Sequence, residues 1–195
     1  DMGAGDDFLI IDSDANDTSL DGGSGSDWLA FRTVNWGASS AKTYTLNSGN
    51  ASNFENLLGS DNDDTLTGDA NANIIIGAKG VDTINGGAGN DILNGGDGDD
   101  TLIGGIGDDS YSYAYDGVTT ISDTSGIDTL FITSCKLGEN SPDKWQHGGY
   151  FLGNDLIISS QLDSPDKLII KEGKISSNKV EKLTYIYLND SSDTF

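Results

Sequence analysis

The stretch from Gly59 to Ser112 divides without a gap into six units of nine residues, which read GSDNDDTLT, GDANANIII, GAKGVDTIN, GGAGNDILN, GGDGDDTLI and GGIGDDSYS. Position six always holds an acid or its amide: Asp64, Asn73, Asp82, Asp91, Asp100 and Asp109. Position eight always holds a large apolar or aromatic residue: Leu66, Ile75, Ile84, Leu93, Leu102 and Tyr111. A fixed period with these residues in constant phase predicts a solenoid, in which each short unit needs its neighbours to bury its apolar side chain.

Each unit has two parts with different local preferences. The first six residues are so rich in glycine that we expect tight turns there, because glycine takes positive φ without steric cost. The last three alternate outward and inward as a short strand does. If two units make one coil, residues 18 apart lie above one another, with Asp64, Asp82 and Asp100 along one edge and Asn73, Asp91 and Asp109 along the other.

Stacked in this way, each edge becomes a ladder of carboxylates about 5 Å apart, the spacing of paired strands. Such carboxylates repel one another unless a cation lies between them. Glycine turns expose carbonyl oxygens beside the carboxylates, so the pocket contains oxygen ligands and no His or Cys. Such a pocket suits Ca²⁺ better than Zn²⁺ or Mg²⁺. The alternative, in which the Asp and Gly residues only form solvated turns, would suit a single copy better than six in register.

The segment resembles the glycine-rich nonapeptide repeat of RTX proteins, the calcium-dependent cargoes of bacterial type I secretion. The resemblance implies an all-β fold, a parallel β-roll with calcium in its turns and a C-terminal β-rich cap. It also implies that carbonyl oxygens from the first four positions of two stacked turns join the position-six aspartates. The turn residues concerned are Gly77, Lys79, Gly80, Gly86, Gly87, Ala88, Gly89, Gly95, Gly96, Asp97, Gly98, Gly104, Gly105 and Gly107.

The position-six residues predict where the ions bind. We expect ions between Asp64 and Asp82, between Asp82 and Asp100, and between Asp91 and Asp109. Asn73 with Asp91 is a weaker site because Asn carries no charge.

Two isolated copies of the motif precede the regular repeat, ending in Phe8-Leu9-Ile10 and Trp28-Leu29-Ala30. Asp7 and Asp27 therefore predict a further calcium site, although their spacing of 20 exceeds one regular coil. Residues 31–58 are expected to form calcium-free coils with longer turns. Trp28 and Trp36 are either core or capping aromatics or a stacking platform for a sugar.

After Ser112 the period continues imperfectly. Thr119 occupies position six of one unit, so that position should lack a ligand, whereas Asp128 restores a carboxylate on the edge of Asp109 and predicts an ion between them. From residue 131 the glycine content falls. We expect strands there to cap the open end of the solenoid, with its core sealed by Phe131, Trp145 and Phe151. The sequence Gly153-Asn154-Asp155-Leu156-Ile157-Ile158, followed by Asp166-Lys167-Leu168-Ile169-Ile170, also resembles the segment that succeeds the repeats in haemolysin-type RTX proteins.

Composition limits the function classes. The chain has 195 residues, 32 acidic and 10 basic, with a net charge of −22. Nucleic acid and anionic membranes are therefore poor partners, and the metal-free chain lies near the disordered class. The single Cys135 excludes an internal disulfide and is expected to pack as a small residue. No long apolar segment predicts a membrane span. A start at Asp1 without a signal peptide suggests a fragment of a larger protein.

These observations predict three regions: N-terminal coils at 1–58, the regular calcium-binding β-roll at 59–130 and a C-terminal cap at 131–195. The main hypothesis is a module that Ca²⁺ folds after type I secretion, outside the cell, within a toxin-like or haemolysin-like protein. The alternative is a calcium-dependent arm that binds a glycan or a surface, as part of an adhesin or a polysaccharide-acting enzyme. We expect no catalysis, because His147 is the only histidine and has no identifiable partner. Ice binding is disfavoured because the third and fifth positions vary.

Overall fold

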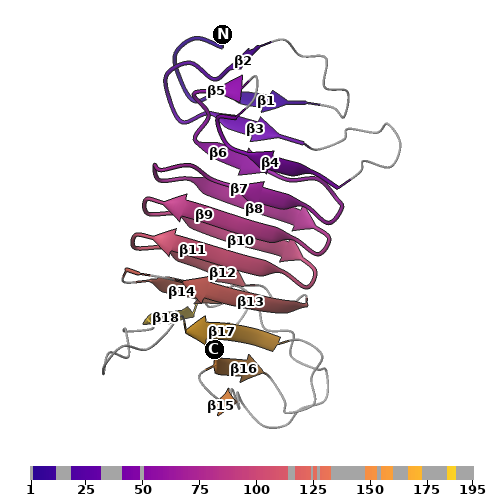
Figure 1. Cartoon of the computed structure of the whole chain (residues 1–195), viewed down its shortest axis with the longest axis vertical. Coiled ribbons are helices and arrows are strands. Elements are labelled where there is room, and N and C mark those ends of the chain that lie inside the picture. Colours follow the sequence, from indigo (N-terminus) through magenta and orange to yellow (C-terminus); the bar gives the residue numbers. More distant parts are fainter. Residues whose placement is uncertain are drawn as a thin grey trace, which may run out of the picture.

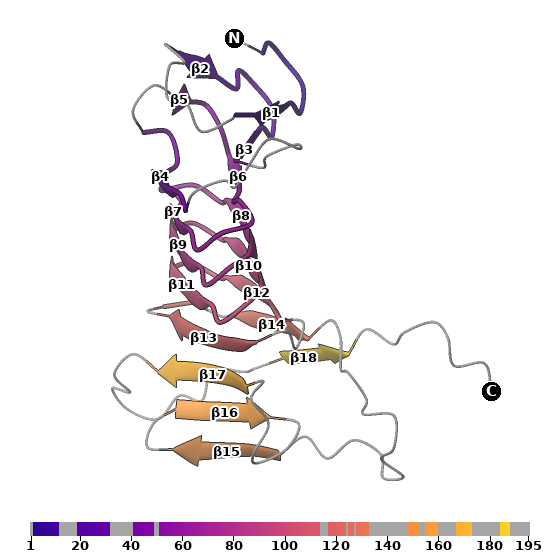
Figure 2. The same ribbon diagram turned by 90° about the vertical axis from the view of Figure 1, so that its right-hand side faces the viewer.

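A computed structural model describes residues 2–11, 19–31, 41–48, 51–113, 117–123, 125–126, 128–132, 148–152, 155–159, 167–172 and 184–187. The regular elements of these residues are 18 β-strands. The strands stack along the long axis of the molecule in two facing sheets (Figures 1 and 2). The chain alternates between the sheets through most of the repeat, so that two units make one coil, as expected. The all-β parallel β-roll that the sequence predicts is confirmed.

The first sheet is parallel throughout and has eight strands. In spatial order these are β1 (Phe8–Ile10), β3 (Trp28–Ala30), β6 (Asn56–Leu58), β8 (Ile74–Lys79), β10 (Ile92–Asp97), β12 (Ser110–Tyr113), β14 (Thr129–Ile132) and β18 (Thr184–Tyr187).

The second sheet also has eight strands. Its parallel part comprises β4 (Thr43–Thr45), β7 (Thr65–Thr67), β9 (Thr83–Ala88), β11 (Thr101–Ile106), β13 (Val118–Asp123) and β17 (Lys167–Glu172). β16 (Asp155–Ser159) and β15 (Gly148–Leu152) extend it with antiparallel pairing. A separate parallel pair, β2 (Leu20–Asp21) with β5 (Ala51–Ser52), lies near the N-terminus.

The registers establish the coil length. Ile92 pairs with Ile74 and with Ser110, so neighbouring residues in this sheet are 18 apart. The next step, from Ser110 to Thr129, spans 19 residues and accommodates the one inserted residue of the sequence. The 18-residue coil that the period predicts is therefore present throughout the regular repeat.

The strands of the regular repeat are longer than expected. β8 to β11 each have six residues, so the first three positions of the following unit continue the strand. Gly105 pairs with Gly87 and Ile106 with Ala88 in the same parallel ladder. The prediction that all six leading positions form turns is wrong for positions one to three, because glycine still donates and accepts the backbone hydrogen bonds of a sheet.

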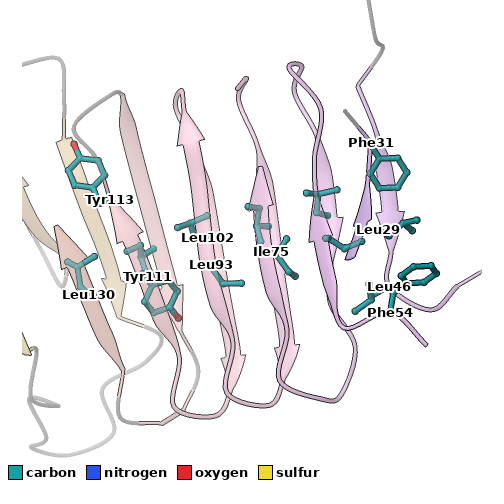
Figure 3. Packing of buried hydrophobic residues seen from close by; sticks show 14 of the residues in the cluster. Leu29, Phe31, Leu46, Phe54, Ile75, Leu93, Leu102, Tyr111, Tyr113 and Leu130 are labelled. Carbon is teal, nitrogen blue, oxygen red and sulfur yellow. The ribbon is translucent and has the colours of Figure 1, made fainter. Parts of the chain in front are cut away.

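One row of apolar side chains fills the space between the sheets (Figure 3). The position-eight residues Leu66, Ile75, Ile84, Leu93 and Leu102 have no exposed surface, and Tyr111, Ile121 and Leu130 continue the row. Burying one such aliphatic side chain contributes about 2 kcal/mol. The row continues towards the N-terminus through Leu57, which pairs with Ile75, and Leu29, which pairs with Leu57. Phe54 and Leu46 belong to the same core cluster. The N-terminal coils therefore share the core of the regular repeat.

Threonines form an outward row on the second sheet. Thr43, Thr65, Thr83, Thr101 and Thr120 pair in succession across β4, β7, β9, β11 and β13. β-Branched residues stacked across neighbouring strands favour this pleated arrangement.

The C-terminal strands lie where the sequence places them, but Phe131, which is expected to seal the core, lies outside it. Phe131 is half-buried and outside the core cluster, because Leu130 beside it points inward and side chains alternate along β14. Its predicted role in sealing the core is therefore wrong. Trp36, Cys135, Trp145 and His147 lie outside the described residues, as does the side chain of Phe151.

Within the described parts of the chain, no helix is both long enough and apolar enough to cross a membrane.

Ala78 carries a strained backbone, which makes it a test of the fold. It occupies position two of its unit, where the other five repeats have Ser60, Asp69, Gly87, Gly96 and Gly105, and its φ is +91°. We expect Ala78→Gly to raise the free energy of unfolding by about 1 kcal/mol, because glycine removes the steric cost of this conformation. The measurement is urea unfolding in saturating calcium.

Ala88→Gly is the matched control. Ala88 lies in β9 and is not among the residues with positive φ, so the same change should lower stability by roughly 0.5–1 kcal/mol. Destabilisation by both substitutions would contradict the strain at Ala78.

Candidate metal centre

The position-six residues form two lines along the edges of the solenoid. Each regular position-six residue immediately precedes a strand, and stacking the strands therefore stacks these side chains. Along the first sheet the line is Asp7, Asp27, Glu55, Asn73, Asp91, Asp109 and Asp128. Along the second sheet it is Lys42, Asp64, Asp82, Asp100 and Thr119.

One hydrogen bond recurs between successive coils. Where the next coil has an aspartate at position six, its Oδ1 accepts the backbone N–H of the position-six residue below it. The N···O distances are 2.7 Å for Asp64 to Asp82, 3.0 Å for Asp82 to Asp100, 2.8 Å for Asn73 to Asp91, 2.8 Å for Asp91 to Asp109 and 2.9 Å for Asp109 to Asp128. Asp7 donates to Asp27 in the same way at 2.7 Å. All the predicted pairs therefore lie together, including those with spacings of 19 and 20.

The other carboxylate oxygen is buried without a partner. Oδ2 of Asp7, Asp27, Asp82, Asp91 and Asp109 accepts no hydrogen bond. The Asp82, Asp91 and Asp109 residues are each only 1% exposed. A buried acceptor without a partner costs about 1–3 kcal/mol, and more if it is charged. Repetition of this atom along both edges indicates that a ligand with positive charge belongs there.

The position-one glycines bring further oxygens into the same space. A Cβ on Gly77 would overlap both Oδ2 of Asp82 and the carbonyl oxygen of Gly95 in the next coil. Gly86 is placed in the same way between Asp91 and Gly104. Glycine is therefore required at position one by close approach. The donor set of carboxylate and carbonyl oxygens fits a hard cation with many oxygen ligands, which is the chemistry of Ca²⁺.

The turn residues that the sequence nominates for carbonyl ligands, from Gly77 to Gly107, lie beside these two lines. Gly80, Gly89, Gly98 and Gly107 all have positive φ at position four, as the expected turns require. The charge of Lys79 lies outside the lines: its Nζ pairs with Asp61 Oδ2 at 3.3 Å, and both side chains are more than half exposed. Lys79 therefore does not neutralise the buried carboxylates.

Burial raises the pKa values of two aspartates in these lines. Burial, reinforced by the charges of Asp100, Asp64 and Asp63, raises the pKa of Asp82 to about 7. Burial and the charge of Asp109 raise the pKa of Asp91 to about 6. Without a cation, the folded state thus holds these carboxylates in an environment that disfavours their charged form.

The position-six side chains of Asp64 and Asn73 obtain hydrogen-bond partners from the protein itself. Ser60 donates to Oδ2 of Asp64 through both its backbone N–H and its hydroxyl, the latter at 3.0 Å. The Asn73 side chain accepts from the Asp69 backbone and donates to the Glu55 carbonyl oxygen at 3.0 Å. Hydrogen bonds from Ser60 and from the Asn73 amide thus occur at the two units where the sequence departs from the glycine–aspartate pattern.

Sequence reasoning missed two carboxylates that the structure adds to the lines. Glu55 continues the line between Asp27 and Asn73, and its Oε2 accepts from the Asp27 backbone N–H at 2.8 Å. Its phase immediately before a strand could have revealed it, but longer turns hide the period there. Asp123 lies beside Asp109 and Asp128, and one carboxylate oxygen from each lies within 4.8 Å of the others. Thr119 occupies position six of its coil and provides no carboxylate there, as predicted.

Asp82 offers a test with effects of opposite sign. Asp82→Asn keeps the Oδ1 acceptor for Asp64 but removes a charge shared by two predicted sites. In calcium we expect a loss of affinity on the order of tenfold, because ligand charge sets affinity in such sites. Without calcium, the folded state should instead become more stable, because a buried like charge is gone. Calcium titration measures the first effect, and the β-structure that far-UV circular dichroism detects in EGTA measures the second.

Asp99→Asn is the control, because Asp99 lies at position five, outside the predicted carbonyl ligands, with an exposed side chain and the same change of charge. Asn also keeps the Oδ1 acceptor for the Val118 backbone N–H. Equal calcium affinity and equal β-structure in EGTA for the two variants would contradict the role of Asp82 as a calcium ligand.

Comparison with known proteins agrees with this geometry. A family model for the RTX calcium-binding nonapeptide repeat (4 copies) matches residues 52–84 and 76–111. No curated protein matches the chain significantly. The matched residues contain β6 to β11 and most of both lines of position-six residues. The chain therefore carries a module of RTX calcium-binding nonapeptide repeats, which bind Ca²⁺ in their turns.

Proposed function

We propose that this chain is a folding module of a secreted bacterial protein, and that Ca²⁺ switches it from an extended to a folded state. The observation that carries the proposal is the row of buried carboxylate oxygens without hydrogen-bond partners at Asp82, Asp91 and Asp109. A folded state that contains them is costly until a cation binds. Folding and calcium binding are therefore one process.

The calcium gradient across the cell boundary gives this linkage its direction. RTX repeats typically belong to type I secreted proteins, and the proposal places this chain in that class. Where free calcium is low, the sites remain empty and the chain stays extended, as export through the secretion machinery requires. Outside, each filled site stabilises the folded state by about 2.7 kcal/mol at a hundredfold excess of calcium over Kd. Sites in one line share aspartates, so we expect cooperative loading.

We further propose that the module belongs to a larger, toxin-like or haemolysin-like protein and has no catalytic activity itself. The sequence of residues 153–158 and 166–170, which resembles the segment after the repeats in haemolysin-type RTX proteins, supports the proposal of a larger parent protein of this kind. The use of the aspartates as metal ligands supports the proposed lack of catalytic activity, because it leaves few candidates for acid–base chemistry.

A second candidate function is a calcium-dependent arm that binds a glycan or a surface. The stacked row of Thr43, Thr65, Thr83, Thr101 and Thr120 favours it, because it presents hydroxyl groups at the regular spacing of the strands. The aromatic platform proposed from Trp28 and Trp36 has less support, since the Trp28 ring stacks on Phe8 with the ring centres 6.2 Å apart. Binding to a glycan array in calcium would favour a glycan-binding role. The absence of such binding would favour the role of a folding module alone.

Far-UV circular dichroism during a calcium titration tests the leading proposal. We expect little β-structure in EGTA, a cooperative gain of β-structure with calcium, and a large rise in Tm. Magnesium should not substitute, because it requires a smaller octahedral site. A spectrum and Tm that do not change between EGTA and calcium would refute the proposal.

A further inference from the structure

Asp123 occupies a place that belongs to glycine in the regular repeat. It ends β13, where Ser122 pairs with Ile103, so Asp123 lies opposite Gly104 at position one. All six regular units have glycine at this position. The substitution therefore introduces a carboxylate directly into the space between stacked turns, and it lies beyond residue 111, where the match to the family ends.

The carboxylate of Asp123 is directed into the line of position-six residues. Its Oδ1 accepts the Gly105 backbone N–H at 3.1 Å and the Tyr111 hydroxyl at 3.1 Å. Oxygens of Asp109, Asp123 and Asp128 lie within 4.8 Å of one another. Three carboxylates thus converge where a regular rung brings together two.

A second observation points to a ligand at this place. Asp109 is 1% exposed, and its Oδ2 has no hydrogen-bond partner. That atom faces the Cα of Gly104, where a Cβ would overlap it and the Tyr111 hydroxyl, and would lie 2.6 Å from Asp123 Oδ1. A buried acceptor beside two further carboxylates favours a cation over a neutral donor, because a cation offsets the negative charge of all three groups.

Tyr111 connects this place to the core. It is the one position-eight residue of the regular repeat that is not Leu or Ile, and it is 3% exposed. Figure 3 shows its side chain among those of the core cluster. Its ring fills the apolar row while its hydroxyl reaches Asp123 at the edge. The sequence thus replaces two consensus residues, at positions one and eight, with two side chains that contact each other.

We propose that Asp109, Asp123 and Asp128 form a terminal three-carboxylate calcium site in which Asp123 is a direct ligand. The inference rests on the proposed calcium binding and adds to it a site of different composition. The site holds its ion more tightly than the two-carboxylate sites, because the third carboxylate adds charge to an otherwise similar set of oxygens. It therefore fills first during a titration, next to the strands that close the end of the solenoid.

The experiment measures calcium binding to the full chain by calorimetry in three variants. Asp123→Asn keeps an acceptor for Tyr111 and Gly105 and removes only the charge, whereas Asp123→Gly restores the repeat consensus. We expect both to weaken the tightest class of sites on the order of tenfold and to leave the sites of the other line, at Asp64, Asp82 and Asp100, unchanged. Asp99→Asn, whose exposed side chain lies outside the predicted ligand positions, should bind calcium as the unchanged chain does.

Terbium luminescence provides an independent reading of the same site. Tb³⁺ replaces Ca²⁺ at oxygen sites and accepts energy from a nearby phenol, so Tyr111 should sensitise the ion that binds first. Tyr111→Phe should reduce the emission of the first equivalent, and Asp123→Asn should shift that emission to higher Tb³⁺ concentrations.

The outcomes separate this inference from the proposed function. If Asp123→Gly and Asp123→Asn bind calcium as tightly as the unchanged chain does, Asp123 is not a ligand and the inference is wrong, while calcium-driven folding stands. If the unchanged chain folds equally well in EGTA, the proposed function fails, whatever the variants do. Loss of only the tightest class in both variants supports the three-carboxylate site.

Discussion

The structure depends on one repeated contact, in which an aspartate carboxylate accepts the backbone N–H of the corresponding residue one coil away. Asp82 and Asp91 make it at 2.7 and 2.8 Å, and the same oxygen–nitrogen pair recurs from Asp27 to Asp128. This contact aligns the turns, but it also leaves the second oxygen of Asp27, Asp82, Asp91 and Asp109 buried without a hydrogen-bond partner. The geometry that orders the stack therefore accumulates negative charge along both edges, so stacking and cation binding depend on each other.

The apolar row and the edges contribute to folding in different ways. Leu66, Ile84 and Leu102 are fully buried in a single row, yet each coil adds only a few such side chains. A solenoid one side chain wide buries less apolar surface per residue than a compact domain does. The remaining stability has to come from the edges, where ligand binding stabilises only the folded state. This division explains why a chain with net charge −22 can form ordered β-structure.

The sequence predicts the regular part of the fold well because its period is preserved there. The phase of Leu93 and Asp91 within one unit places one inside and the other on an edge, and the register confirms both. The other features depend on three-dimensional contacts that the period does not encode. Glu55 lies after turns of irregular length, Ser60 satisfies Asp64 locally, and Asp123 replaces a glycine. The extension of β8 to β11 through glycine positions reflects backbone pairing, to which side-chain patterns are insensitive.

The most direct test of the central claim asks whether protons can replace calcium. In the metal-free folded state burial raises the pKa of Asp82 to about 7 and of Asp91 to about 6, whereas an unfolded aspartate has a pKa of about 3.9. Between these values the folded state binds more protons than the unfolded state, so its stability falls as pH rises. Far-UV circular dichroism of the calcium-free chain should therefore show more β-structure at about pH 5 than at about pH 7.5. Equal β-structure at both, or more at the higher pH, would contradict the account.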